Sequence, residues 1–419
     1  MNIATQWMRD AAARARAASA VLAALPDRAR NAALGAAANA IRAHAPAIEA
    51  ANARDLAAFD AAGGTQAFRD RLALNPARIA AMALGLDDIA GLPDPLARVL
   101  AEWERPNGLR IRRIPQPIGV IGMIYESRPN VGADAAGLCL KAGNAVILRG
   151  GSDSFHSAGA IHQAVTEGLR AAGVPQDAVQ IPPATDRAYV AAMLGAAGQI
   201  DLIIPRGGKS LVERVQAEAR VPVLAHAEGL CHTYIHAKAD PAMARAVLAN
   251  AKMRRTGVCG ATEVLLIDAA IAPSLLPVLV ADLRVLGCDF RAGPRARAIV
   301  PDLPPTQPGD FDREWLDAIL TIAVVDDIDA ALRHISHHGS EHTDAIITED
   351  AAAAAKFLNG VGSAVAMWNA STQFCDGGEF GFGAEIGIAT GRMHARGPIG
   401  LEQLTTFRYL VLGSGQVRP

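Results

Sequence analysis

The sequence predicts an α/β protein that contains two βαβ blocks with parallel sheets. Short apolar runs alternate with helical segments from residue 118 to about 204, and a second alternating block runs from about 233 to 368. Strands and helices that alternate in this way form parallel sheets, in which ligands bind beyond the carboxyl ends of the strands. The first hundred residues instead predict alanine-rich helices, interrupted at Gly63-Gly64 and at 93–95.

Each block contains four predicted strands. Those of the first block are 118–124, 145–148, 179–181 and 200–204, with helices at 131–142 and 152–172. Those of the second block are 263–267, 320–325, 345–348 and 363–367.

Two further segments, 109–114 and 405–412, alternate in side-chain character with a period near two. They predict a two-stranded arm outside both blocks. Because a two-stranded ribbon is marginal by itself and usually needs a partner surface, we expect a homo-oligomer. The alternative is an edge hairpin on a monomer.

Composition and charge exclude several classes of protein. The 419 residues carry 40 Lys and Arg against 42 Asp and Glu, a net charge of −2. This balance gives no electrostatic basis for binding nucleic acid or an anionic membrane. No window is apolar over the length that spans a bilayer, and the stretch 1–30 predicts an amphipathic helix and not a transit peptide. The five scattered cysteines are typical of a reducing cytoplasm and not of a disulfide framework or zinc cage.

Cys259 is the strongest candidate for a catalytic residue. It lies between two nearby glycines, after cations that include Arg254 and Arg255, and before the apolar run 264–267. Glycines make the backbone approachable, and cations favour the thiolate, which is the nucleophilic form of cysteine. Most free cysteines are buried small hydrophobic residues, but such a cysteine would lie within the apolar run. We therefore predict that Cys259 is a nucleophile.

Two glycine-containing loops after strands have the composition of anion-binding sites. They are Arg149-Gly150-Gly151-Ser152, in which Ser152 is a predicted helix N-cap, and Pro205-Arg206-Gly207-Gly208. Backbone amides at the start of a helix suit a phosphate group. Each loop alone is equally consistent with an ordinary βα turn, but together they favour a dinucleotide phosphate site. Ile203 occupies the position of the first glycine of a P-loop, which argues against an NTPase.

The segment after the first predicted strand offers candidate substrate contacts. Arg128 is a fixed cation that suits a carboxylate or a phosphate. Ser127 and Asn130 are candidate donors to a developing oxyanion. A surface turn closed by Pro129 is equally consistent with these residues.

The histidines do not predict a metal site. His334, His338 and His342 are spaced by four, but Gly339-Ser340 interrupts the helix before His342, and no cysteine lies close in sequence. We expect solvated or substrate-facing histidines and no bound metal.

Several longer strings resemble the gamma-glutamyl phosphate reductase family. They fall in order across most of the chain, at 118–131, 143–152, 205–208, 338–340, 369–372, 383–387 and 394–398. The first of them is the most specific. The family belongs to the aldehyde dehydrogenase-like superfamily, so the resemblance implies two βαβ domains and a β-stranded oligomerisation arm.

The resemblance implies NADPH-dependent reduction of L-glutamate 5-phosphate to L-glutamate 5-semialdehyde and phosphate, the second step of proline biosynthesis from glutamate. It implies a thioester on Cys259, NADPH/NADP as cofactor, a homo-oligomer and a functional association with glutamate 5-kinase. We expect a cytoplasmic protein without nucleic-acid or membrane partners.

The resemblance also implies roles for particular residues and segments. The implied catalytic residues are Cys259, Ser127 and Asn130; the implied substrate-binding residues are Arg128, Arg255, His338, Ser371 and Thr372; the implied cofactor-binding residues are Arg149, Gly150, Gly151, Ser152, Pro205, Arg206, Gly207, Gly208 and Glu385. The implied domains are a cofactor-binding domain at 1–106 and 116–232, a catalytic domain at 233–368, a return segment at 369–400 that faces the active site and cofactor, and the arm at 107–115 and 401–419.

The sequence departs from the family pattern near the chemistry. Arg254, Thr256 and Gly260 replace the usual Gln, Pro and Asn around Cys259, and Gln373 replaces an arginine. Loss of the Asn side chain leaves backbone amides as oxyanion donors. Loss of the arginine is expected to weaken substrate binding and turnover.

Other enzymes are alternatives. One class is another oxidoreductase of the superfamily, which is CoA-acylating, hydrolytic or histidinol dehydrogenase-like. Another is a phosphotransferase that uses Gly208-Lys209-Ser210. Phosphate dependence, metal content and ATP-dependent phosphorylation of glutamate separate them from the reductase.

Overall fold

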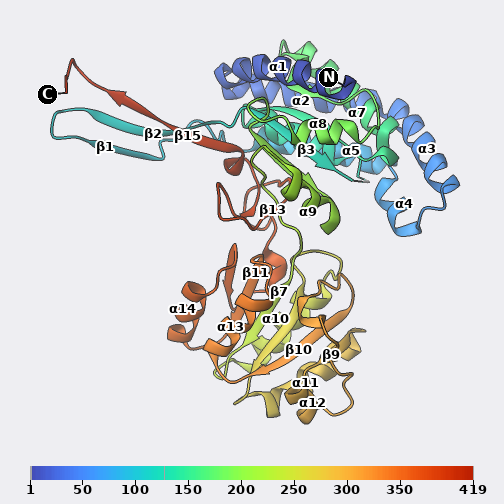
Figure 1. The fold of residues 1–419 in the computed structure, drawn as a ribbon, viewed down its shortest axis with the longest axis vertical. Helices are drawn as coiled ribbons and strands as arrows, with labels where there is room; N and C mark the ends of the chain where they lie inside the picture. The colour runs from blue at the N-terminus through green and yellow to red at the C-terminus, as the bar shows by residue number, and fades with distance from the viewer. Residues whose placement is uncertain (1, 127, 419) are drawn as a thin grey trace. The chain divides into compact units, whose positions relative to one another are not determined.

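The computed structural model describes residues 2–126 and 128–418, and the chain forms two compact units (Figure 1). The first unit comprises Met1–Ala225, Phe382–Gly387 and Ile399–Pro419, and the second comprises His226–Gly381 and Ile388–Pro398. Each unit has its own parallel sheet and its own core. The predicted α/β class is confirmed.

The first unit has a four-stranded parallel sheet in the order β5-β4-β3-β6. Its strands are β3 (Val120–Tyr125), β4 (Ala145–Arg149), β5 (Val179–Gln180) and β6 (Leu202–Arg206), and its helices are α1 (Ile3–Ala24), α2 (Asp27–Ala43), α3 (Ala45–Ala61), α4 (Gln66–Leu72), α5 (Pro76–Gly91), α6 (Val131–Lys141), α7 (Phe155–Ala171), α8 (Ala188–Leu194) and α9 (Lys209–Glu218). Helix α1 begins where the Asn2 side chain accepts a hydrogen bond from the Thr5 amide at 2.8 Å. One face of α1, including Ala11 and Ala15, is buried against sheet residues such as Ile147. Side chains three or four positions apart share one helix face, which explains this packing.

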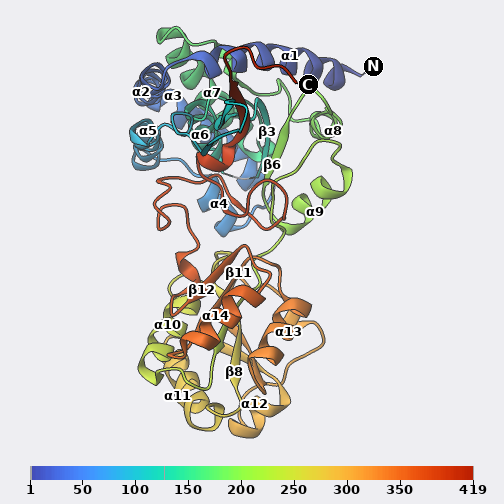
Figure 2. The ribbon, with the colours of Figure 1, turned by 90° about the vertical axis from the view of Figure 1, so that its left-hand side faces the viewer.

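The second unit has a six-stranded parallel sheet in the order β12-β11-β7-β8-β10-β9. Its strands are β7 (Cys231–Ile235), β8 (Thr262–Asp268), β9 (Asp289–Ala292), β10 (Ile319–Val325), β11 (Thr343–Ile347) and β12 (Val365–Trp368), and its helices are α10 (Pro241–Met253), α11 (Ala272–Val285), α12 (Pro294–Ile299), α13 (Ile328–His338) and α14 (Ala351–Gly360). Leu265 and Ile267 of β8 pack with α10 and α11, whereas Val264 and Leu266 pack with α13 and α14. Figure 2 shows these helices around β8. Because helices cover both faces, the middle of this central strand, residues 264–267, is an unbroken apolar run.

The sequence does not predict β7 and β9 of this sheet. Strand β7 is fully buried but polar: His232 Nδ1 lies 2.8 Å from Asp344 Oδ1, and Thr233 Oγ1 lies 2.7 Å from Thr262 Oγ1. These partners lie on other strands, so the sequence of β7 alone gives no apolar signal. Strand β9 has only four residues, two of them charged, and lies at the sheet edge.

A third sheet is the antiparallel arm of the first unit, which Figure 1 shows projecting from the helices. Strands β2 (Arg110–Pro117) and β15 (Thr405–Leu412) pair along their whole length, so the predicted pairing is confirmed. The prediction of two strands is wrong, because β1 (Ala101–Glu104) also pairs with β2. Strand β1 has no apolar pattern in sequence, because two of its four residues are glutamates. Glu102 forms ion pairs with Arg110 (3.3 Å) and Arg112 (3.1 Å) of β2.

Two smaller features complete the description. Strands β13 (Ile388–Ala389) and β14 (Gly397–Pro398) form a short antiparallel pair in the second unit. Within the described part of the chain, no helix combines the length and apolar character needed to cross a membrane.

Candidate active site

Cys259 lies in a loop of the second unit, between the end of α10 at Met253 and the start of β8 at Thr262. Its side chain is partly buried. Cys231 begins the neighbouring strand β7, and His342 directly precedes β11, so both lie at the same amino edge of the sheet. The nucleophile candidate is therefore at the amino ends of parallel strands, and the carboxyl-end rule for ligand sites does not locate it.

Close backbone contacts hold the Cys259 loop. The Cys231 thiol donates a hydrogen bond to the Cys259 carbonyl oxygen at 3.1 Å. Gly229 lies against the same carbonyl, because a Cβ at this position would be 2.1 Å from the Cys259 oxygen. Gln373 Nε2 donates to the carbonyl oxygens of Ala251 (3.0 Å) and Arg255 (3.1 Å). The backbone is thus fixed before and after the Cys259 side chain.

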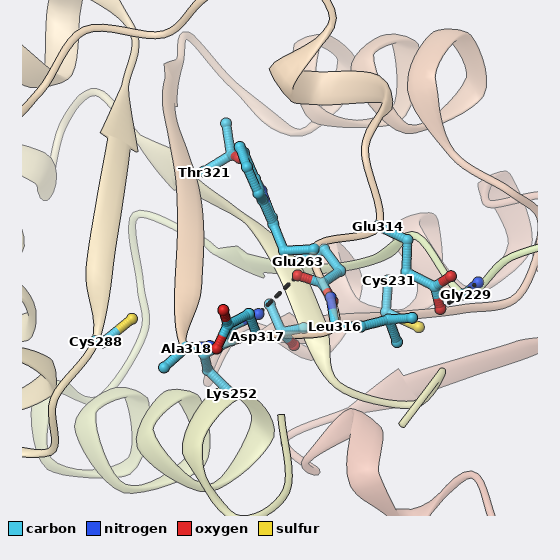
Figure 3. A network of polar contacts seen from close by, with 12 residues as sticks. Gly229, Cys231, Lys252, Glu263, Cys288, Glu314, Leu316, Asp317, Ala318 and Thr321 are labelled. Atoms are coloured by element: carbon cyan, nitrogen blue, oxygen red, sulfur yellow. Dashed lines mark hydrogen bonds and ion pairs between the residues drawn. The ribbon is translucent and has the colours of Figure 1, made fainter. Parts of the chain in front are cut away.

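A buried ion pair lies beside this loop (Figure 3). Lys252 Nζ donates to Glu263 Oε2 at 2.6 Å, and both side chains are fully buried. The other carboxylate oxygen of Glu263 accepts a hydrogen bond from the Leu316 amide at 3.2 Å. Burial raises the pKa of Glu263 to about 7, although the Lys252 ammonium opposes the shift. Figure 3 also shows Glu314, which accepts from the Gly229 amide at 2.9 Å and so fixes the chain that packs on Cys259.

Two imidazoles lie next to the Cys259 thiol. One ring nitrogen of His226, one of His342 and Cys259 Sγ all lie within 4.8 Å of one another. His342 is fully buried, and burial, followed by the nearby His226, lowers its pKa to about 3. Its ring is therefore neutral at physiological pH. The sequence groups His342 with His334 and His338 by spacing, but α13 ends at His338 and the structure separates His342 from them.

The implied substrate residues of the second unit have different environments. The Arg255 side chain is exposed. His338 Nδ1 lies 2.7 Å from Asp312 Oδ1. Ser371 Oγ accepts from the Gln373 amide at 3.3 Å, and Thr372 Oγ1 lies 3.0 Å from Thr262 Oγ1. Ser371 and Thr372 are buried, so their hydroxyls contribute to internal hydrogen bonding beside the loop.

The implied residues around the end of β3 belong to the first unit. Ser127 lies outside the described residues. Arg128 is exposed, and Asn130 is partly buried. The Asn130 amide donates to Asp134 Oδ2 at 3.1 Å, which ties it to the first turn of α6. Burial raises the pKa of Asp134 to about 6, so part of its population is protonated near neutral pH.

The first predicted cofactor loop is more closed than the sequence indicates. Arg149 is buried, and its Nη2 donates to the Thr185 carbonyl at 2.7 Å. A Cβ at Gly150 would be 3.1 Å from the Tyr125 ring, so the loop packs closely on that side chain. The prediction that Ser152 is a helix N-cap is wrong, because Ser152–Ser154 form a 3-10 turn and α7 begins at Phe155.

The second loop is shorter than predicted. The predicted strand end at Ile204 is wrong, because β6 continues through Pro205 and Arg206, and Gly208 is the residue before α9. The Gly208 amide donates to Glu126 Oε2 at 2.9 Å, and a Cβ at Gly207 would lie 2.5 Å from the same oxygen. The implied cofactor residue Glu385 lies in the return segment of this unit, in which a Cβ at Gly387 would be 3.6 Å from Arg206 Cδ.

Comparison with known proteins identifies the family. The model of the Aldehyde dehydrogenase family matches residues 2–290. The chain is 73% identical over 412 residues to a gamma-glutamyl phosphate reductase of Acidiphilium cryptum, a match that covers 98% of this chain and 97% of the relative. It is 61% identical over 412 residues to the protein of that name from Rhodospirillum rubrum, which covers 98% of this chain and 96% of the relative.

Solved structures agree with this result. The crystal structure of gamma-glutamyl phosphate reductase from Thermotoga maritima has a TM-score of 0.96 and 42% sequence identity, and the match covers 98% of this chain and 100% of that chain. An acetylating aldehyde dehydrogenase from Geobacillus thermoglucosidasius has a TM-score of 0.68 at 18% identity, over 99% of this chain and 98% of that chain, and shares the fold. The resemblance predicted from the sequence is confirmed, and the chain belongs to the gamma-glutamyl phosphate reductases of the aldehyde dehydrogenase family.

Proposed function

We propose that the protein reduces L-glutamate 5-phosphate to L-glutamate 5-semialdehyde and phosphate with a nicotinamide cofactor, the second step of proline biosynthesis. A relative that carries the reductase name matches 98% of the chain at 73% identity. The structural observation that supports the chemistry is the Cys259 loop, in which a partly buried thiol is held between a glycine contact and the Gln373 hydrogen bonds.

Cys259 acts as the nucleophile in this proposal. Its thiolate attacks the acyl carbon, the bond from that carbon to the phosphate oxygen breaks, and phosphate departs. The acyl group remains on Sγ as a thioester. When bound, the reduced nicotinamide supplies the hydride for reduction of this thioester. The bond between carbon and Sγ then breaks, so that Cys259 regains its thiolate as the semialdehyde departs. Arg254 and Arg255 are exposed cations of the same loop and favour the thiolate electrostatically.

The position of Glu263 favours reduction of the thioester by hydride over its hydrolysis by water. This carboxyl group lies only four residues after Cys259, but it is fully buried and engaged by Lys252 and the Leu316 amide. A carboxylate that faced the thioester could activate water and release glutamate. An acyl phosphate is already activated, so the forward reaction needs no such base.

We assign cofactor binding to the first unit and covalent chemistry to the second. The start of α9 suits a phosphate group, because Gly207 and Gly208 leave no Cβ over the helix amides and Arg206 precedes them. Arg149, Gly150, Gly151, Ser152, Pro205 and Glu385 complete the proposed cofactor set. Glu126 accepts from the Gly208 amide, so a bound phosphate would replace this carboxylate. We propose NADPH over NADH on the family resemblance.

The proposed substrate and oxyanion contacts follow the family resemblance. Arg128 and Arg255 are the cations that would bind the carboxylate or phosphoryl group. His338, Ser371 and Thr372 are the further substrate residues, and Ser127 and Asn130 are the proposed oxyanion donors. With Gly260 in place of an Asn, backbone amides of the Cys259 loop provide the remaining donors.

The reaction is tested in the oxidative direction. Purified protein with glutamate 5-semialdehyde should form NADPH from NADP⁺ only when phosphate is present, and Cys259→Ser should lower this rate at least about a thousand-fold. NAD⁺ in place of NADP⁺ measures the cofactor preference. Phosphate-independent turnover would indicate a hydrolytic dehydrogenase, and dependence on coenzyme A an acylating one. Near-normal turnover of Cys259→Ser would refute the thioester route.

The arm supports a homo-oligomer. Trp103, Phe407 and Tyr409 are exposed on the two outer strands of the arm, β1 and β15, with ring centroids of Trp103 and Tyr409 at 6.0 Å and of Phe407 and Tyr409 at 5.7 Å. Exposed aromatic clusters of this kind are typical of protein interfaces. We also propose a functional association with glutamate 5-kinase, which supplies the acyl phosphate. Co-elution of the purified proteins measures that association.

A further inference from the structure

Three candidate metal ligands meet at the amino edge of the second unit's sheet. Cys259 Sγ and one ring nitrogen each of His226 and His342 lie within 4.8 Å of one another. The two imidazole rings form an edge-to-face pair, with centroids 5.2 Å apart and ring planes at 68°. Thiolate and imidazole bind Zn²⁺ at about 2.3 Å and about 2.0–2.1 Å respectively. The three atoms are close enough in space to be candidates for one ion.

An independent observation points to a ligand at this place. His342 Nε2 is buried and has no hydrogen-bond partner among the described residues. Its Nδ1 lies 3.0 Å from Thr343 Oγ1 and 3.5 Å from Cys231 Sγ. The Cys231 thiol donates to the Cys259 carbonyl, which leaves its sulfur as an acceptor. When His342 Nδ1–H donates to this sulfur or to Thr343 Oγ1, Nε2 carries the lone pair. A buried acceptor without a partner costs free energy, and a metal ion would satisfy it.

The second imidazole is oriented by the backbone. His226 Nδ1 lies 2.9 Å from the Ile388 carbonyl oxygen, which can only accept a hydrogen bond, so Nδ1 carries the proton. Hydrogen bonding of one ring nitrogen to a carbonyl fixes the tautomer in which the other nitrogen coordinates a metal.

We propose that Cys259, His226 and His342 form an open three-ligand site for Zn²⁺ or a similar transition metal. On binding, the S–H bond of Cys259 breaks, its proton passes to solvent, and a sulfur–metal bond forms without change of oxidation state. Three protein ligands leave a fourth position for water or for an oxygen of a bound small molecule. Sequence spacing does not predict this set, because the three residues lie on separate segments.

The site has a consequence that rests on the proposed function. A metal on Sγ occupies the lone pair that would attack the acyl carbon, so the metal should inhibit turnover and substrate should protect against it. Metal binding itself does not depend on that function, because it needs only the three side chains.

The test is a titration of full-length, reduced, chelator-treated protein with Co²⁺ alone, followed by competition with Zn²⁺. We expect one equivalent of Co²⁺ with a thiolate-to-cobalt charge-transfer absorption and release of about one proton per metal. His342→Gln and His226→Gln should each weaken Co²⁺ binding at least about 100-fold. His236→Gln is the matched control, since this histidine is partly buried in the same unit and lies 2.8 Å from Thr348 Oγ1. The half-buried position of His226 makes its replacement the variant that retains the fold.

Two results would overturn the proposal: absence of the charge-transfer absorption, or unchanged affinity in both histidine variants. The outcome for the proposed function is separate. If Cys259→Ser kept phosphate-dependent turnover while the native protein gave the cobalt absorption, the metal site would stand and the thioester mechanism would fail.

Discussion

Replacing Lys252 with methionine removes one partner of the buried ion pair beside the Cys259 loop. Lys252 Nζ lies 2.6 Å from Glu263 Oε2, and neither side chain is exposed to solvent. Removal of one member of a buried pair typically costs about 3–5 kcal/mol of unfolding free energy, because the other charge loses its compensation. Glu263 can lower that cost by binding a proton, so the loss should depend on pH.

The sign of this dependence follows from the pKa of Glu263. Burial raises it to about 7 in the native protein, although Lys252 opposes the shift, and loss of Lys252 raises it further. A carboxyl whose folded pKa exceeds its unfolded value retains a proton that the unfolded chain has lost, so stability falls as pH rises between the two values. The stability difference between Lys252→Met and the native protein should therefore widen above about pH 7, by up to about 1.4 kcal/mol per pH unit.

Urea unfolding at about pH 6 and about pH 8.5, followed by tryptophan fluorescence and circular dichroism, measures this difference. Two controls isolate the cause. Lys252→Met combined with Glu263→Leu should recover much of the loss, because an apolar pair leaves no buried charge. Lys238→Met breaks an exposed pair with Asp350 and should cost at most about 1 kcal/mol. A Lys252→Met loss below about 1 kcal/mol, or one that is equal at both pH values, would refute the reasoning.

Three further outcomes are expected. Gly229→Ala places a Cβ 2.1 Å from the Cys259 carbonyl oxygen and should lower kcat/KM roughly 100-fold with the fold retained. Gly257→Ala is the control and should have a small effect, because its Cβ would meet its nearest atom at 3.8 Å; equal kcat/KM values for the two variants would contradict the contact. Phe407→Ser with Tyr409→Ser should raise the dissociation constant of the oligomer at least about 30-fold in analytical ultracentrifugation, and an unchanged value would exclude the arm from the interface. His342 has a folded pKa of about 3, so the unfolded chain binds a proton first as pH falls below about 6.5. The free energy of unfolding should therefore decline between about pH 6.5 and pH 3, and His342→Gln should make this decline shallower in acid-unfolding curves.

The sequence predicts those parts of the fold whose signal is local. Strand β8 contains an apolar run that follows a turn, and β15 is rich in β-branched and aromatic residues, so both are predicted within a residue of their bounds. Strand β7 is missed because its histidine and threonine are satisfied by Asp344 and Thr262, which lie on other strands. The same limit applies to the candidate site. Cys259 is evident from its neighbours in sequence, whereas the approach of His226 and His342 to it exists only after the strands have assembled.

Two residues that differ from the family pattern, Gly260 and Gln373, lie close together in the structure. A Cβ at Gly260 would lie 3.2 Å from the Thr372 carbonyl oxygen, so an asparagine there must displace the turn that carries Gln373. Gln373 is buried, and its side-chain amide donates to two carbonyls of the segment before Cys259, so we expect it to position this segment. Gly260→Asn alone should therefore lower both the melting temperature and kcat/KM, and Gln373→Arg alone should bury a charge and do the same. Since the two residues share one turn, the double variant should lose less than the sum of the single losses, with a coupling of about 0.5–3 kcal/mol. Additive losses in this double-mutant cycle would show that the two positions act independently. A gain in kcat/KM for Gln373→Arg alone would restore the substrate role that the sequence predicts for an arginine there.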